Sequence, residues 1–594
     1  MKRIKTKIVG ASMVLLLIVS IYACNKDFLN KAPLGSLDPS NLANSAGVQG
    51  LLIGAYSLLD GYGGANSGWE SAASNWVYGS VASDDSYKGS DAGDQPDINP
   101  IETYTATSSD YYFNNKWSLL MDGIQRSNDV IRTMRLAKDI TPADSLLISA
   151  QSRFLRAHYE FEGLRMWRNF PFVDESITYG DKNFNVTNTT DIRPLIEADL
   201  EYAIANLPND WTTTGEKGRV NAWAAKCYLV KLYMYEHKFT EAKTLLDQII
   251  GPNPTVAVGV TSGGLHYKLV NFEDNFNPAA QNNAEGVFEV QNSVNDNSNG
   301  GNGNWGDVLN FPYGPPGGCC GFNQPSQSLV NSYRVDANGL PLLDTWNDVD
   351  VKNDQGIKST DPFTPETAPL DARLDWTVGR RGIPYLDWGT HPGNDWIRDQ
   401  NNGGPYSPIK NLYFKAQTGT FTDNNFWTPG VTANDYIIIR YADVLLWAAE
   451  CEVEVGSLEK ALTYVNTVRA RAADPSGWVK KSGGTPAANY KVGLYPSFPT
   501  KDFARKAVRF ERKLELAMEG QRFFDLQRYS IDPSANYANN GYMADVLNAY
   551  IAKEKGRRTY LQGKSFTKDK TEIFPIPQQQ IDFEHGALVQ NPNY

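Results

Sequence analysis

The chain has 594 residues, and its 41% hydrophobic and 21% charged content is that of a folded globular protein. Its formal charge is 56 − 67 = −11, and an acidic surface argues against nucleic acid as a ligand. Only five cysteines occur, so disulfides do not hold the fold together.

Residues 1–23 have the pattern of a secretory signal peptide. Basic residues precede an apolar run from Ile8 to Ala23, which is too short and wrongly flanked for a membrane-spanning helix. The small Ala23 directly before Cys24 is what a lipoprotein signal peptidase requires. We therefore expect a lipid on Cys24 that tethers the mature chain to a bacterial membrane, outside the cytoplasm. An ordinary signal peptide with a chance cysteine is the alternative.

Two long segments, 60–114 and roughly 251–435, are rich in Gly, Pro, Asn and Asp. Loops of this length are usually functional or disordered. Both segments hold many Trp and Tyr residues, which disordered segments lack. We therefore expect ordered loops that display aromatic side chains on a helical frame.

Apolar residues at helical spacing predict helices over 115–170 and 191–207, and helical hairpins over 222–249 and 440–473. In both hairpins a small or apolar residue precedes an alanine of the second helix by twelve positions: Val230 and Ala242, then Ala449 and Ala461. This is the skeleton of a tetratricopeptide repeat, in which small residues let two helices pack closely. Two copies so far apart predict a helical scaffold with long insertions.

A further helix is predicted over 502–528, where Glu511, Glu515 and Glu519 lie one above another at i, i+4 and i+8. Like charges at this spacing repel and need cationic neighbours. We expect Arg440, on the hairpin helix, to reach this row and lock the two elements together. Arg512 and Arg522 are available locally. A solvated acidic face is the alternative.

Cys319 and Cys320 are adjacent and flanked by glycines. Adjacent Cα atoms lie about 3.8 Å apart, whereas disulfides usually span ~4.4–6.8 Å between Cα atoms. A bond between them needs a strained, rigid turn, which the glycines could tolerate. The sequence leaves a vicinal disulfide and two free thiols as alternatives.

The C-terminal third carries the motifs that identify the family. They read IIIRYADVLLWAAECEVEVGSLEKALTYVNTVRARA (437–472), RFERKLELAMEGQRFFDLQRY (509–529) and EIFPIPQQQID (572–582). In this order they resemble the signatures of the SusD/RagB family of nutrient-binding lipoproteins. The resemblance continues upstream to CNKDFLNKAPLG (24–35), in which Lys26-Asp27 is similar to the surface-export signal of Bacteroidetes-type bacteria. It predicts one SusD-like domain over 24–594, with a helical half (24–250) and a loop-rich and C-terminal half (251–594).

The resemblance implies a mainly α-helical fold of tetratricopeptide-like helix pairs with a loop-rich ligand face. It implies a lipid-anchored protein on the outer membrane, facing the cell exterior. Such a protein binds a glycan, or in some members a peptide. It passes the ligand to a SusC-like TonB-dependent transporter, catalyses nothing and needs no cofactor.

A sugar presents C–H patches that alternate with hydroxyls, which an aromatic ring beside amide and carboxylate groups can match. We expect ligand contacts from Trp76 and Trp305 first. The segment 69–85 adds Trp69, Asn75, Tyr78, Asp84 and Asp85; the segment 292–313 adds Tyr313; Trp388 and Trp396 form a third set. For each tryptophan, the alternative is a ring that fills the small core of its own loop.

Motifs for catalysis and metal binding are missing from the sequence. It contains no His-Glu-x-x-His zinc motif and no Gly-x-Ser-x-Gly nucleophile elbow. The Asp/Asn cluster at 344–354 could hold Ca²⁺ but lacks the spacing of a known loop, so we expect an acidic surface loop and no metal. Unknown carboxylate pairs keep a surface glycoside hydrolase open as an alternative. A tetratricopeptide adaptor that binds a protein partner is a third hypothesis.

Overall fold

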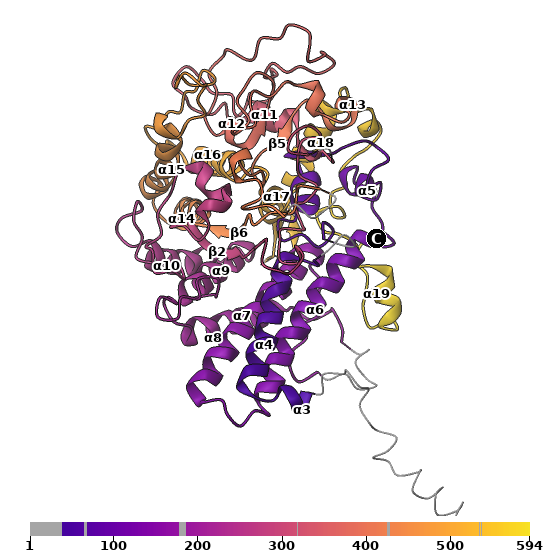
Figure 1. Cartoon of the computed structure of the whole chain (residues 1–594), viewed down its shortest axis with the longest axis vertical. Coiled ribbons are helices and arrows are strands. Elements are labelled where there is room, and N and C mark those ends of the chain that lie inside the picture. Colours follow the sequence, from indigo (N-terminus) through magenta and orange to yellow (C-terminus); the bar gives the residue numbers. More distant parts are fainter. Residues whose placement is uncertain are drawn as a thin grey trace, which may run out of the picture.

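The computed structural model describes residues 39–63, 68–177, 186–317, 319–423, 428–533, 535 and 537–594. Cys24 and the signal peptide lie outside these residues. The fold is mainly α-helical, as predicted, with long irregular segments on one side of the helices (Figure 1). Among the residues that the structure describes, no helix combines the length and the apolarity needed to cross a membrane.

The first helices form a bundle at the base of Figure 1, where α4, α6, α7 and α8 lie side by side. Side-chain caps explain where several helices begin. The Oγ1 of Thr141 accepts the N–H of Asp144 at 3.2 Å, and Pro142 occupies the first turn of α7. The bounds are α3 (Pro39–Leu42), α4 (Ser45–Tyr56), α5 (Ile98–Glu102), α6 (Tyr111–Met134), α7 (Pro142–Trp167) and α8 (Arg193–Asn206).

Both predicted hairpins are confirmed. The first is α9 (Ala222–Tyr235) with α10 (Phe239–Ile250), and the second is α14 (Tyr441–Val455) with α15 (Leu458–Ala473). Although the chain leaves the scaffold between them, α10 packs directly against α14 (Figure 1). The two hairpins are therefore neighbours in one helical stack, and the insertion leaves and re-enters at their junction.

Short antiparallel strand pairs join segments that are distant in sequence. They are β1 (Ser86–Gly89) with β3 (Phe322–Pro325), β2 (Gly286–Val290) with β6 (Tyr436–Arg440), β4 (Val378–Gly379) with β5 (Ser407–Pro408), and β7 (Ile531–Asp532) with β8 (Ala538–Asn539). The short helices of the insertion are α11 (Gln327–Ser332), α12 (Leu374–Thr377) and α13 (Gln400–Gly403). The largest hydrophobic core contains residues from Val48 to Leu588 and so belongs to both halves of the chain.

The helix predicted over 502–528 is two helices, α16 (Lys501–Glu515) and α17 (Arg522–Ser530), followed by α18 (Tyr542–Glu554) and α19 (Gln578–Phe583). Between α16 and α17 the backbone takes positive φ at Met518 (65°) and Gly520 (69°). A Cβ on Gly520 would lie 1.7 Å from the carbonyl oxygen of Ser74, so no side chain fits there. The turn thus brings the first loop-rich segment against the C-terminal helices.

Candidate functional site

Trp76 and Trp305, the two rings expected to contact ligand first, lie in the interior. They are 1% and 4% exposed. The indole N–H of Trp76 donates to the carbonyl of Gly306 at 2.9 Å, and that of Trp305 donates to Gly300 at 2.8 Å. The expectation is corrected for these two residues, because a ring covered by protein offers no face to a sugar.

Asn75 and Tyr78 are also buried. The Asn75 amide donates to Glu162 at 2.9 Å, and the Tyr78 hydroxyl oxygen lies 2.9 Å from the carbonyl oxygens of Glu70 and Tyr112. Both side chains are therefore occupied inside the protein. Their expected ligand role is corrected to one of holding the first loop-rich segment in place.

Asp84 and Asp85 form internal contacts with the C-terminal helices. Arg522 donates to Asp84 at 2.7 Å, Lys513 also donates to Asp84, and Asp85 accepts the N–H of Met518 at 3.1 Å. Burial alone would raise the pKa of Asp84, but Arg522 and Lys513 outweigh it and lower the pKa below its usual range. These two carboxyl groups do not reach the surface, so their expected ligand role is corrected as well.

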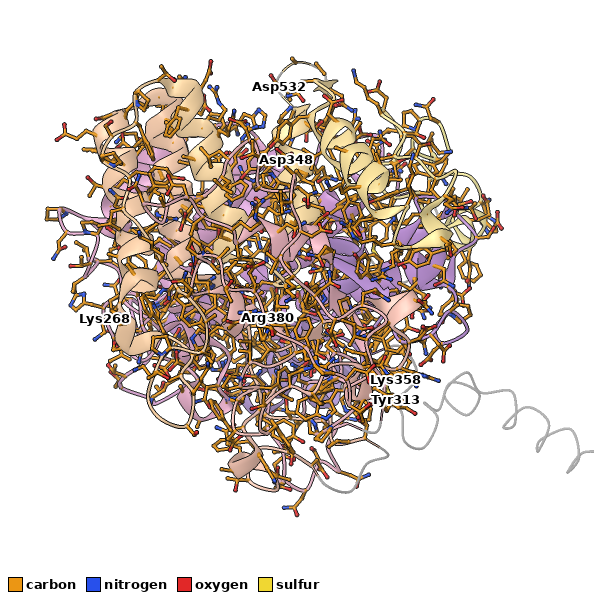
Figure 2. All side chains as sticks on the ribbon, turned by 90° about the horizontal axis from the view of Figure 1, so that it is seen from above. Lys268, Tyr313, Asp348, Lys358, Arg380 and Asp532 are labelled. Carbon is orange, nitrogen blue, oxygen red and sulfur yellow. A yellow bond between two sulfur atoms is a disulfide. The ribbon has the colours of Figure 1, made fainter. Side chains whose placement is uncertain are left out.

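The remaining aromatic candidates keep some exposure. Trp69 is half-buried against the main core, and Trp388 and Trp396 are half-buried around Tyr385 and Tyr413. Tyr313 is 42% exposed and is labelled near the edge of the molecule in Figure 2. Ligand contact by these four residues stays a prediction.

Cys319 and Cys320 are joined by a disulfide in the structure, a short distance along the chain from Tyr313. Intact mass without reductant tests the bond in the protein. A mass lower by two hydrogens is expected, and its absence would mean two free thiols. The bond stays a prediction until that measurement.

A buried network of charges joins the second insertion to the helical scaffold. Its carboxylates are Glu285, Asp371, Glu511, Glu515 and Glu519, and its cations are Arg373, Lys410, Arg440, Arg469 and Arg471. Five negative and five positive side chains thus meet in the interior. The solvated acidic face is excluded, because the three predicted glutamates are buried.

Arg440 reaches the glutamate row, as the sequence predicted, and belongs to this network. It donates to Glu515 at 2.5 Å, Glu285 at 2.8 Å and Glu519 at 3.0 Å. It lies at the end of β6, directly before the hairpin helix. Burial opposes ionisation of Glu515, but the nearby Arg471, Arg440 and Arg373 lower its pKa well below the usual range.

Arg512 and Arg522 do not neutralise the glutamate row. Arg512 pairs instead with Asp443 at 2.5 Å and Asp525 at 3.0 Å, and Arg522 pairs with Asp84. The cations that do so come from the insertion and the second hairpin. Apart from Arg440, sequence spacing within one helix could not reveal these distant partners.

A surface cleft of about 610 Å³ is lined in part by Glu289 and Val290, at the end of β2. Its walls come from four segments that are distant in sequence. They are residues 53–63, which include the end of α4 and the 3₁₀ turn η1 (Ser57–Asp60), then Arg126 of α6, the loop 216–219 before α9, and residues 289–302. The segment 292–313 predicted to bind ligand reaches this cleft through Ser293, Gly301 and Asn302. Its aromatic rings do not line it.

The aromatic side chains of the cleft are Tyr56 and Tyr62. The Tyr62 hydroxyl donates to Asp122 at 2.7 Å, and the Tyr56 hydroxyl donates to Gln151 at 3.1 Å. These bonds hold both rings at the wall. Sequence reasoning missed them, because both lie outside 69–85 and 292–313, the segments whose composition predicted ligand contacts.

Charged side chains in the cleft differ in how well they are paired. Arg219 donates to Glu216 at 2.7 Å, whereas in the described part of the chain Asp60 accepts no hydrogen bond from another residue. Burial raises the pKa of Asp60 to about 8 and that of Glu289 to about 7. Carboxyl groups with raised pKa values in a cleft mark a candidate functional site.

No cluster of His, Cys, Asp and Glu suited to a metal ion occurs in the residues that the structure covers. In the Asp/Asn segment 344–354, Asn347 and Asp350 accept hydrogen bonds from Asn331, and Lys506 pairs with Asp344. The chain's own donors thus occupy these oxygens. The cleft offers hydrogen-bonding groups and two rings, a lining that suits binding of a polar ligand.

Comparison with known proteins gives a consistent match. Residues 284–594 match the SusD family. The chain is 24% identical over 559 residues to SusD-like protein P25 of Formosa agariphila, a match that covers 88% of this chain and 90% of that one.

Solved structures share the fold. A SusD superfamily protein from Bacteroides vulgatus superposes with a TM-score of 0.63 at 19% identity, covering 94% of this chain and 99% of that one. Surface glycan-binding protein A from Bacteroides thetaiotaomicron, in complex with laminarihexaose, gives a TM-score of 0.59 at 20% identity, covering 93% and 100%.

Proposed function

Because this chain belongs to the SusD family, we propose that it is a non-catalytic protein that binds a glycan at the cell surface and delivers it to a SusC-like TonB-dependent transporter. The observation that carries the proposal is the cleft, in which two tyrosine rings, amides and carboxyl groups line one opening of about 610 Å³. Rings supply apolar area for C–H patches, and the polar groups fix hydroxyls. A structural neighbour was solved with laminarihexaose, which supports a glycan as the ligand class.

The location follows from the signal peptide and Cys24. Lipid on the mature N-terminal cysteine would anchor the protein to the outer membrane, with its body facing the cell exterior. A Cys24→Ala variant should lose acyl labelling and its membrane fraction. Retention of both would contradict the anchor.

The transporter is the proposed protein partner. Affinity purification of the lipidated chain from its own outer membranes should bring down a TonB-dependent transporter. If the lipidated chain purifies without a transporter, just as the lipid-free chain does, the proposed partnership is wrong.

The binding experiment uses calorimetry on the mature chain without its lipid, against polysaccharides and peptides, with each mixture checked for breakdown. Binding to one glycan class without breakdown is expected. Binding of a peptide alone would make the protein a RagB-like peptide receptor, and breakdown would favour a surface glycoside hydrolase.

A pair of aromatic deletions locates the site. Tyr62→Ala in the cleft should weaken glycan binding by about tenfold or more. Tyr111→Ala removes the same side chain from a position that is 41% exposed and does not line the cleft. It should leave affinity unchanged; equal losses in both variants would place the site elsewhere.

A further inference from the structure

A second, smaller hollow combines aromatic rings with exposed polar side chains. We propose that it binds one uncharged sugar unit of a glycan chain, as a contact additional to the cleft, an inference that rests on the proposed glycan binding. The hollow has a volume of about 100 Å³, and among the described residues its lining shares none with the cleft. It is therefore a separate candidate site.

The hollow is built by three segments that are distant in sequence. They are residues 271–272, the segment 372–376 around the start of α12, and the segment 470–478, which includes the end of α15 and the 3₁₀ turn η8 (Pro475–Gly477). In Figure 1, α12 and α15 lie in the upper part of the molecule, whereas α4 and α6, which contribute to the cleft, lie in the lower part. The fold thus creates two sites from different elements.

Trp376 and Trp478 provide the aromatic surface of the hollow. Both rings are half-buried and so keep some exposed area. The indole N–H of Trp376 donates to the carbonyl of Gly477 at 2.7 Å, and that of Trp478 donates to the carbonyl of Ala472 at 3.0 Å. Because each N–H is bound to the backbone, the rings are held in position, and their apolar surface suits the C–H patches of a sugar.

Asn271 and Asp474 supply polar groups beside these rings, and both side chains are exposed. Asp474 accepts the N–H of Ser476 at 2.9 Å, and this hydrogen bond lowers the pKa of Asp474 below its ordinary value. Asp474 is therefore a carboxylate at neutral pH. A carboxylate has about four sites that accept hydrogen bonds, so Asp474 can accept further bonds from sugar hydroxyls.

The cations of the hollow are already paired within the protein. Arg373 and Arg471 both belong to the buried network, where acids of the chain bind each of them. A charged ligand would therefore find no unpaired cation in the described lining, and recognition depends on rings and hydrogen bonds. The network also holds these walls in place, and a rigid site loses less entropy when it binds.

The size of the hollow limits the ligand to one unit of a chain. Sites that enclose a whole small ligand have volumes of about 300–1,000 Å³, several times that of this hollow. One sugar ring can rest against it while the rest of the chain stays in solvent. A polysaccharide repeats the same unit many times, so it can occupy the cleft and the hollow, and a second contact raises avidity.

The test is fluorine NMR on the lipid-free mature chain labelled with fluorotryptophan. The probes are laminarihexaose, cellohexaose, mannohexaose and xylohexaose, each added in excess. At least one should shift the signals of Trp376 and Trp478, which are assigned from single-site variants. The signal of Trp223 should not move, because this residue is half-buried on α9 and lines neither site.

Two variants measure the contribution of the hollow, with the Trp376 shift as the readout of affinity. Trp478→Ala should weaken hexasaccharide binding there by about tenfold or more. Asp474→Ala, which changes an exposed side chain, should weaken it by about fivefold or more. Asp348→Ala makes the same change at an exposed position labelled in Figure 2, outside both linings, and should have no effect. Circular dichroism and thermal unfolding confirm that the variants fold.

The outcomes separate this inference from the proposed function. A hexasaccharide that binds in calorimetry but shifts neither Trp376 nor Trp478 overturns the second site and leaves glycan binding in place. Unchanged affinity in folded Trp478→Ala and Asp474→Ala variants overturns the assignment to this hollow. If no hexasaccharide binds the wild type by either method, the proposed function and this inference fail together.

Discussion

The buried network around Arg440 and the cleft both contain Asp and Glu side chains, but these side chains have different roles in the two regions. In the network, each glutamate meets arginines at hydrogen-bond distance, as with Glu515 and Arg440 at 2.5 Å. In the cleft, Asp60 meets no cation in the described part of the chain. Carboxylates that the fold satisfies hold it together, whereas one that it leaves unsatisfied is available to a ligand.

The two regions are also mechanically linked. Gly286 of β2 pairs with Arg440 of β6, and Glu289 pairs with Ile437 further along the same ribbon. Glu285 binds Arg440 directly before β2 begins, and Glu289 reaches the cleft near its other end. The network therefore fixes the position of one cleft wall.

Removal of the central cation should have the largest effect. Arg440→Met leaves Glu285, Glu515 and Glu519 without their shared partner in the interior. Loss of one member of a buried ion pair costs about 3–5 kcal/mol, and denaturant unfolding should show a loss of this size. An unchanged free energy of unfolding would show that the network does not lock insertion and scaffold together.

Acid should destabilise the protein mainly through the carboxylates of the network, because their protonation breaks buried ion pairs. The pKa values of Glu515, Glu519 and Asp371 are lowered, because nearby arginines and Lys410 outweigh burial. Their stabilisation is full above the unfolded pKa values of about 4 and is lost as pH falls through the lower folded values. The melting temperature should therefore drop steeply below about pH 4. Glu515→Gln should have a lower melting temperature than the wild type at pH 6, but its melting temperature should fall less steeply as the pH is lowered. A fall as steep as that of the wild type would show that Glu515 does not contribute to the acid sensitivity.

The acids of the cleft should give stability the opposite dependence on pH. Burial raises the pKa of Glu289 from 4.5 to about 7, so the folded state binds the proton more tightly and stability declines as pH rises from about 4.5 to 7. Glu289→Gln should gain about 1–3 kcal/mol at pH 8 and almost nothing near pH 4.5. The exposed Glu201→Gln in α8 is the control and should stay within about 0.5 kcal/mol at both pH values. A pH-independent effect at Glu289 would contradict the burial argument.

The smallest effect is expected at the surface. Lys506 and Asp344 form an ion pair at 2.6 Å with side chains 50% and 73% exposed. Lys506→Ala should change the free energy of unfolding by less than about 0.5 kcal/mol, because water and salt screen such pairs. A loss as large as that of Arg440→Met would mean that burial does not separate the two kinds of pair.

The sequence predicted the helical elements because their signal is local. Apolar spacing located both hairpins, and the row of like charges in 511–519 correctly required a cation from another element, Arg440. It did not predict the break before Gly520, which arises where that residue meets the backbone of Ser74. Contacts across hundreds of residues leave no local periodicity.

The candidate site was harder to predict than the fold. Rings in Gly- and Asn-rich loops can face a ligand or fill the interior, and composition is the same in both cases. Trp76 and Trp305 fill the interior, where each indole N–H finds a backbone carbonyl. The cleft residues Asp60 and Tyr62 come together with residues 216–219 and 289–302 only in three dimensions.

The packing of α10 against α14 also has a consequence for biogenesis. The apolar face of α10 cannot be covered until the chain beyond Tyr441 is present, because its neighbour in the stack comes from there. Contacts of such sequence separation form late and leave hydrophobic surface open to aggregation in the meantime. A chain that ends near Ile250 would keep that face exposed, so the first half should depend on the second to become soluble. Until the C-terminal helices are present, the chain should need a chaperone to avoid aggregation.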